Sequence, residues 1–174
     1  MIVLETITFK YAPREDRVLT AINAGKAQTW SCWLTRRLAL ALLERAAELV
    51  ANTSPLAQRA PVEARSEVAS FEREAAIAGT AKAMSNTPAE ILKKSETGAE
   101  LVDRVTISSR GNDFQMELKG ENNGGAAGSV ARVALQRILQ MLQAEVAKAE
   151  WLVTPGKPPP APPLQETGPK PARH

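Results

Sequence analysis

Cysteine and histidine are almost missing from this chain of 174 residues, which contains one of each, Cys32 and His174. One cysteine cannot form a disulfide within the chain. One cysteine and one histidine cannot supply the four ligands of a structural zinc site. A nucleophilic cysteine needs a nearby base, and the single histidine is far away in sequence. The sequence therefore predicts a non-enzymatic protein with no catalytic residues, no metal and no cofactor, in which Cys32 is a small buried residue.

Long apolar runs are also missing. The longest run is far shorter than the ~20 residues that a membrane helix needs, and no basic start followed by an apolar stretch marks a signal peptide. We therefore expect a cytoplasmic protein without membrane contact. The glycine-rich stretch at 120–128 fits neither G-x-x-x-x-G-K-[ST] nor G-x-G-x-x-G. It is expected to be a flexible connector rather than an anion site.

Aromatic residues make up only 4% of the chain, so the core must be aliphatic. The net charge is +3, but residues 1–153 carry only +1 of it and residues 154–174 carry the rest. A protein dedicated to nucleic acid usually shows a basic stripe, and none is present in the linear sequence. Charge therefore gives no support to a nucleic-acid role.

Two runs of strand-like sequence are present, and each is followed by a long apolar helix. In the first run, β-branched residues predict strands at 2–10, 17–23 and 27–34, and a helix at 35–51 with Thr35 as its N-cap. The second run predicts strands at 101–109 and 113–119 and a helix at about 130–151, capped by Ser129. The apolar stripe of the second helix leaves Gln136, Gln140 and Gln143 facing water.

The two runs can be aligned. Asp16-Arg17-Val18 matches Asp103-Arg104-Val105, and after a nine-residue insertion Arg36 matches Arg132 and Leu43 matches Leu139. This predicts a ββα unit used twice, as in an internal duplication, with Asp16-Arg17 and Asp103-Arg104 forming reciprocal ion pairs. The expected fold is α+β and two-layered, with an antiparallel sheet packed against two long helices.

Four segments follow from this pattern. Residues 1–51 form the first unit, residues 100–153 complete the same domain, and residues 52–99 form a weakly packed helical insertion. A capping box at Thr87–Glu90 predicts a short helix within that insertion. Residues 154–174 are proline-rich and expected to be disordered, either as a linker or as a polyproline II ligand at Lys157–Pro163.

The first helix has an apolar stripe too wide for one sheet face to cover. Leu38, Leu42 and Leu49 lie on one side, while Leu40, Leu43 and Val50 lie around the other. We expect a protein partner or a second copy of the chain to bind Leu40, Leu43 and Val50, together with Trp33. This makes the chain an interaction module, such as an accessory subunit, although the helical segment at 62–84 is a competing cover.

A cluster of aromatic and basic residues supports an alternative function. Trp30 and Trp33 could stack bases, and Arg36 and Arg37 could hold phosphates of a single-stranded nucleic acid. The repeated sheet-plus-helix order resembles that of Whirly and PUR domains in topology alone. The chain departs from them in strand count and in basic content.

Overall fold

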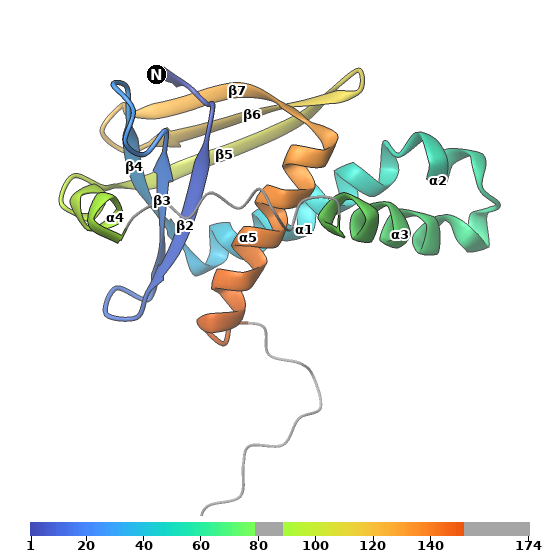
Figure 1. Cartoon of the computed structure of the whole chain (residues 1–174), viewed down its shortest axis with the longest axis horizontal. Helices are drawn as coiled ribbons and strands as arrows, with labels where there is room; N and C mark the ends of the chain where they lie inside the picture. The colour runs from blue at the N-terminus through green and yellow to red at the C-terminus, as the bar shows by residue number, and fades with distance from the viewer. Residues whose placement is uncertain (79–88, 152–174) are drawn as a thin grey trace, which may run out of the picture.

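The computed structural model describes residues 1–78 and 89–151, which form one mixed sheet with two long helices against it (Figure 1). The α+β class expected from the sequence is confirmed. In chain order the elements are β1 (Ile2–Val3), β2 (Ile7–Ala12), β3 (Arg17–Ile22), β4 (Trp30–Thr35), α1 (Arg36–Asn52), α2 (Pro55–Arg59), the 3₁₀ turn η1 (Val62–Ala64), α3 (Arg65–Ala78), α4 (Ala89–Glu96), β5 (Glu100–Arg110), β6 (Asp113–Gly120), β7 (Gly125–Ala131) and α5 (Arg132–Lys148).

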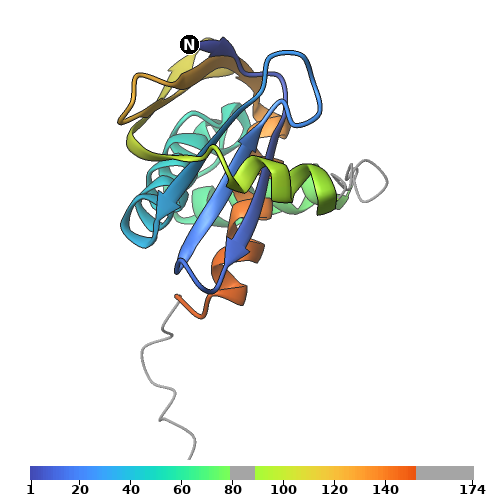
Figure 2. The same ribbon diagram turned by 90° about the vertical axis from the view of Figure 1, so that its left-hand side faces the viewer.

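The sheet has the order β1-β7-β6-β5-β4-β3-β2. β2-β3-β4 and β5-β6-β7 are antiparallel meanders, whereas β4 pairs with β5, and β1 with β7, in parallel. The expectation of a purely antiparallel sheet is therefore wrong. A helix and the insertion carry the chain back across the sheet before β5 begins, and such a crossover produces a parallel pair. The two meanders run in different directions, so that the sheet curves over the helices (Figures 1 and 2).

The helices and strands of the two halves correspond at a constant displacement of 96 residues. Adding 96 to the bounds of α1 gives those of α5, and each helix has 17 residues. The same shift places β2, β3 and β4 within β5, β6 and β7. With this displacement Arg36 and Arg132 each begin a long helix, and no nine-residue insertion is needed to align the strands. β3 corresponds to β6 rather than to β5, and each unit is βββα.

The buried residues of the two long helices also lie 96 positions apart. The core side of α1 consists of Ala39, Leu42, Ala46 and Val50, and that of α5 contains Leu135, Ile138, Leu142 and Val146 at the equivalent positions. In the strands, Phe114, Met116 and Leu118 are fully buried, as their alternation predicts. Leu38, Leu43 and Leu49 are only partly buried. The centre of the α1 stripe is thus rotated from the expected face.

β7 is a strand that the sequence does not predict. Its residues include Gly125, Ala126 and Gly128, which have low β propensity, and the stretch is expected to be a flexible loop. It is nevertheless a strand because small residues allow close approach. A Cβ on Gly128 would lie 2.7 Å from the carbonyl oxygen of Leu4. α5 consequently begins at Arg132, and its N-cap is Ala131 without a side-chain hydrogen bond, rather than Ser129.

The first predicted strand, 2–10, is split between the two edges of the sheet. β1 pairs with β7 at one edge, and β2 lies at the other. Asn23 supports the turn between them. Its side-chain oxygen accepts hydrogen bonds from the backbone of Glu5 and Thr6, and its amide nitrogen donates to the carbonyl of Val3. Asn23 has a positive φ of 51°, which asparagine tolerates better than most residues.

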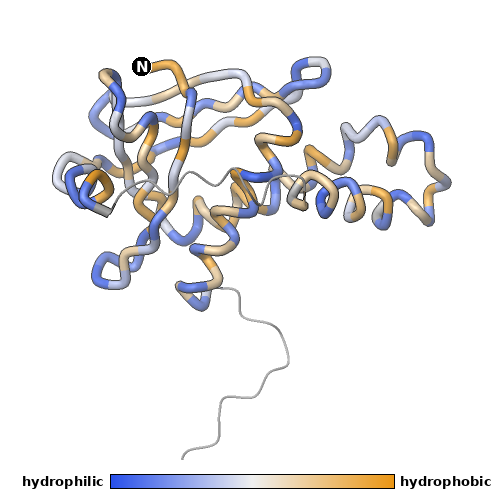
Figure 3. The backbone as a smooth tube through the Cα atoms, in the orientation of Figure 1, coloured by the Kyte–Doolittle hydropathy of each residue, from blue (hydrophilic) through white to orange (hydrophobic). Residues whose placement is uncertain are grey.

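The insertion between the units has two separate roles. α4 lies against β3 and β4 on the face opposite α1, where Leu19 and Ala21 are fully buried, so the sheet is covered on both sides there. α2, η1 and α3 form a helical arm that protrudes from the body (Figure 1), and apolar residues occur along it (Figure 3). Thr87, which begins the predicted capping box, and the tail from Thr154 lie outside the described residues. None of the described helices is long and apolar enough to cross a membrane.

Candidate functional site

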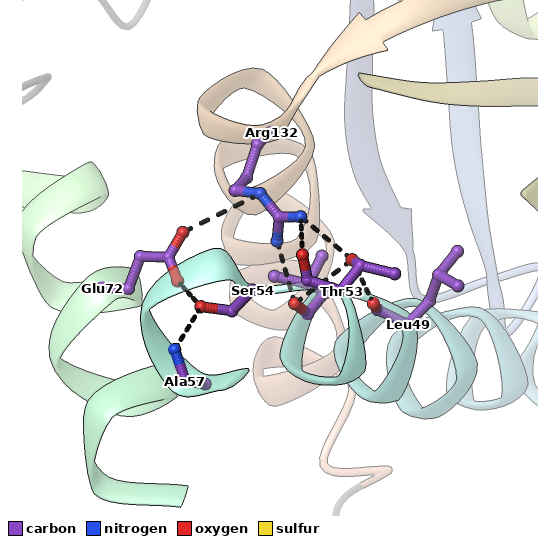
Figure 4. Close-up of polar contacts among 7 residues, drawn as sticks. Leu49, Thr53, Ser54, Ala57, Glu72 and Arg132 are labelled. Carbon is purple, nitrogen blue, oxygen red and sulfur yellow. Dashed lines mark hydrogen bonds and ion pairs between the residues drawn. The ribbon is translucent and has the colours of Figure 1, made fainter. Parts of the chain in front are cut away.

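A buried arginine at the start of α5 joins the arm to the body (Figure 4). The guanidinium group of Arg132 donates to the carbonyl of Val50 at 2.9 Å, and to the carbonyl and hydroxyl oxygens of Thr53 at 2.7 and 3.0 Å. It also lies 5.1 Å from the ring centroid of Phe114. A cation is favourable at the carbonyl end of a helix, so Arg132 acts as a C-terminal cap for α1.

The same guanidinium group contacts the arm through Glu72 of α3. The Nε of Arg132 lies 3.8 Å from one carboxylate oxygen of Glu72. The other oxygen accepts a hydrogen bond from the hydroxyl of Ser54, which itself caps α2 by accepting from the amide of Ala57. These contacts connect α1, α2, α3 and α5. We call Arg132, Glu72, Ser54 and Thr53 the clasp.

Arg36 occupies the equivalent position in α1 and makes a weaker contact of the same kind. It donates to the carbonyl of Trp151, just beyond α5, at 3.4 Å. Each helix therefore begins beside the end of the other, and the pair is antiparallel. The expected reciprocal ion pairs between Asp16-Arg17 and Asp103-Arg104 are not among those of the described residues. Asp16 instead accepts hydrogen bonds from Trp151 and Tyr11.

The arm exposes three large apolar side chains. Leu56 of α2 is 57% exposed, Val62 of η1 71% and Phe71 of α3 72%. Other faces of the arm do pack, since α3 contacts both α1 and α5. The arm thus covers part of the apolar surface of α1, as the sequence offered for the segment at 62–84 in place of a partner. Phe71, which the sequence assigns to that cover, is largely exposed and does not provide it.

Where α3 meets α1 and α5, the three helices enclose a groove of about 260 Å³. Its apolar lining includes Leu43 and Leu139, which are equivalent residues of the two helices. Gln136 lines it too and is only 3% exposed, although the sequence predicts that it faces water. Neither the oxygen nor the nitrogen of its side-chain amide has a hydrogen-bond partner among the described residues.

The partner-binding residues predicted from the sequence fall in different places. Leu40 and Leu43 are half-buried on α1, and Leu43 lines the groove. Val50 is 7% exposed and belongs to the core, although it also lines the groove beside Leu43. Trp33 is half-buried on β4, a strand whose outer face α4 contacts. The structure therefore brings Leu43 and Val50 together at the groove but places Leu40 and Trp33 elsewhere.

The predicted nucleic-acid cluster is also divided. Trp30 and Trp33 are an odd number of residues apart in β4 and so point to opposite faces of the sheet. The indole nitrogen of Trp30 donates to Glu100 at 2.6 Å, and Arg36 is engaged with Trp151. Arg37 is exposed. The two tryptophans cannot form one stacking platform.

The glycine-rich stretch holds an anion supplied by the chain itself. Glu100 accepts from the backbone amide of Asn122 at 2.6 Å and from Trp30. A Cβ on Gly124 would lie 1.7 Å from the Glu100 carboxylate, so glycine is required for this contact. The loop is therefore fixed against β5 rather than open to an external anion.

Cys32 is fully buried in β4. Burial, with a smaller contribution from the charge of Glu100, raises the pKa of its thiol well above the usual range. A raised pKa disfavours the reactive thiolate. Among the described residues, no group of three or more His, Cys, Asp or Glu side chains is arranged to hold a metal ion.

Comparisons with known proteins add no relative. No family model, curated protein or solved structure matches this chain.

Proposed function

We propose that this protein is a non-enzymatic interaction module that associates through its helical arm. The observation that carries this proposal is the exposure of Leu56, Val62 and Phe71 on one protruding element. Large side chains such as phenylalanine contribute most where they are buried against a partner. Three of them on a single arm favour a protein partner over a purely structural insertion.

The partner that we propose is a second copy of the same chain. Residues 55–78 carry three arginines and four glutamates, so the arm has both signs of charge and almost no net charge. A surface of mixed charge can be complementary to itself about a twofold axis. The clasp supports this role because it fixes the arm to α1 and α5, and a fixed arm loses less entropy on association.

Phe71→Asp tests the arm directly. We expect the wild-type chain to sediment as a dimer at tens of micromolar and Phe71→Asp to sediment as a monomer, because a carboxylate cannot be buried in an apolar contact without a large cost. Val133→Asp is the matched control, since Val133 is 45% exposed on α5, outside the arm. It should leave the dimer intact.

Analytical ultracentrifugation over a concentration series, with circular dichroism to confirm folding, distinguishes the outcomes. A wild-type chain that stays monomeric at roughly 200 μM would contradict association between copies. Equal dimerisation of Phe71→Asp and the wild type would remove the arm from the interface.

We also propose an internal duplication and a cytoplasmic setting. The constant displacement of 96 residues, with equivalent buried positions in both long helices, supports an internal duplication of a βββα unit. A reducing, cytoplasmic setting suits a chain with one buried thiol and no possible internal disulfide.

A further inference from the structure

We infer that the groove between α1, α3 and α5 receives Phe71 from the arm of a second copy of the chain, and that two such contacts close the dimer. This inference rests on the proposed association between copies and states which surface receives the arm. Phe71 is 72% exposed on an arm that protrudes from the body (Figure 1), and the groove lies where that arm meets the two long helices. A protruding ring and an apolar recess on one molecule can form the same contact twice about a twofold axis.

Phe71 is turned away from the groove of its own chain. Phe71 and Arg73 both belong to α3, and Arg73 lines the groove. Consecutive residues of a helix are turned by about 100°, so these two side chains leave α3 about 200° apart. The ring that enters the groove must therefore come from another molecule.

The size and the lining of the groove suit a phenyl ring. Leu43, Ala47, Val50 and Leu139 form the apolar part of the lining, and all but Val50 are half-buried, so they still present surface to a partner. An apolar cavity of about 150 Å³ can hold benzene, so a groove of about 260 Å³ has room for the ring of Phe71. Each of the two contacts then removes apolar surface of both copies from water.

The charges beside the ring complement one wall of the groove. Glu67 and Glu74 lie one turn before and one turn after Phe71, on the same side of α3, and both are exposed. Arg73 carries the positive charge of the groove on its α3 wall, whereas Glu44 carries the negative charge on its α1 wall. Arg73, Glu67 and Glu74 take part in none of the ion pairs of the described residues. A ring seated in the partner's groove therefore turns its two carboxylates toward the Arg73 wall, and this fixes the orientation of the arm.

Disulfide crosslinking between two single variants tests which surface the arm meets. Both full-length chains carry Cys32→Ala, so the introduced thiol is the only one. Ala75→Cys places it one turn from Phe71 on the exposed side of α3, and Gln140→Cys places it at the rim of the groove. Mixed in equal amounts with a mild oxidant, the two chains should form the mixed disulfide roughly tenfold more than either forms a disulfide with itself, because the bond needs Cα atoms within about 7 Å. Val133→Cys, on α5 but outside the groove, is the matched control for Gln140→Cys and should crosslink roughly tenfold less.

Ala47→Phe tests the same contact without thiols, because it fills the groove from within. Sedimentation should show the dissociation constant of the dimer raised roughly tenfold or more, since the groove can no longer admit the partner's ring. The urea midpoint should stay within about 0.3 M of the wild type, because Ala47 is only half-buried at an open groove. Ala144→Phe, the same change at an exposed position of α5 outside the lining, should leave the dissociation constant within about twofold.

The outcomes separate this inference from the proposed association. A wild-type chain that stays monomeric at roughly 200 μM refutes both. A dimer whose affinity Ala47→Phe leaves unchanged overturns the groove alone. So does a dimer in which Ala75→Cys crosslinks with itself in preference to Gln140→Cys, because the two arms would then meet each other. If Ala47→Phe does not fold, the mixed disulfide decides the question.

Discussion

Replacing Arg132 with methionine should be one of the most damaging single changes in the chain. The substitution removes three hydrogen bonds to the end of α1 and the ion pair with Glu72, while methionine can still cover the ring of Phe114. The side chain of Arg132 is 10% exposed and that of Glu72 19%, so solvent replaces these contacts poorly. Breaking a buried charged pair typically costs about 3–5 kcal/mol.

The chain supplies its own control in Arg36, the equivalent residue of α1. Arg36 is exposed and makes one long hydrogen bond of 3.4 Å. With a urea dependence of about 2 kcal/mol per molar for a domain of this size, Arg132→Met should lower the unfolding midpoint by about 2 M. Arg36→Met should lower it by less than about 0.5 M, since exposed polar contacts contribute little.

Urea titrations followed by tryptophan fluorescence measure both midpoints. Arg132→Lys keeps the charge but loses the planar fork, and should fall between the wild type and Arg132→Met. It also keeps the comparison measurable if Arg132→Met does not fold. Equal midpoints for Arg36→Met and Arg132→Met would refute the reasoning, because the clasp would then contribute no more than a surface contact.

Two further predictions concern buried positions. Cys32 should react with a thiol reagent such as DTNB only at the rate at which the protein opens, and rapid modification of the native protein would contradict its burial. The free energy of unfolding should fall as pH rises above about 9, because the unfolded thiol ionises there while burial keeps the folded thiol protonated. Cys32→Ala should remove that pH dependence. Gly128→Ala should lower the free energy of unfolding by about 1–3 kcal/mol, because the new Cβ meets the carbonyl of Leu4. Gly98→Ala is the control and should change stability little, since nothing lies within 4 Å of its Cβ position. A tolerated Gly128→Ala would mean that β1 can move away from β7 at no cost.

Periodicity made much of the fold predictable. Alternation identifies β6 from Phe114, Met116 and Leu118, and the helical stripe of α5 gives Leu135, Ile138, Leu142 and Val146 as core residues. Thr35 caps α1 as expected, by accepting a hydrogen bond from the amide of Leu38. These features depend on local sequence, so a single chain suffices to find them.

The remaining features depend on contacts between distant segments. β7 is a strand because β6 and the N-terminal residues pair with it, not because glycine and alanine favour strands. Likewise, Gln136 reads as a polar residue on a water-facing side of α5 until α1 and α3 are placed beside it. The sequence does show that both long helices begin with arginine, Arg36 and Arg132. It does not show that only Arg132 is buried, because that depends on the position of the arm.

The placement of residues 1–6 has a consequence for how this protein can meet other chains. β1 covers the outer side of β7, and the connection to β2 brings the same short segment to the opposite edge of the sheet. At that opposite edge the carboxylate of Glu145 accepts a hydrogen bond from the backbone amide of Tyr11. Open strand edges are the usual templates for unwanted pairing and for amyloid growth. β1 has only two residues and the Tyr11 amide of β2 is already engaged, so each border offers little for strand addition, and we expect recognition on the helical side of the molecule.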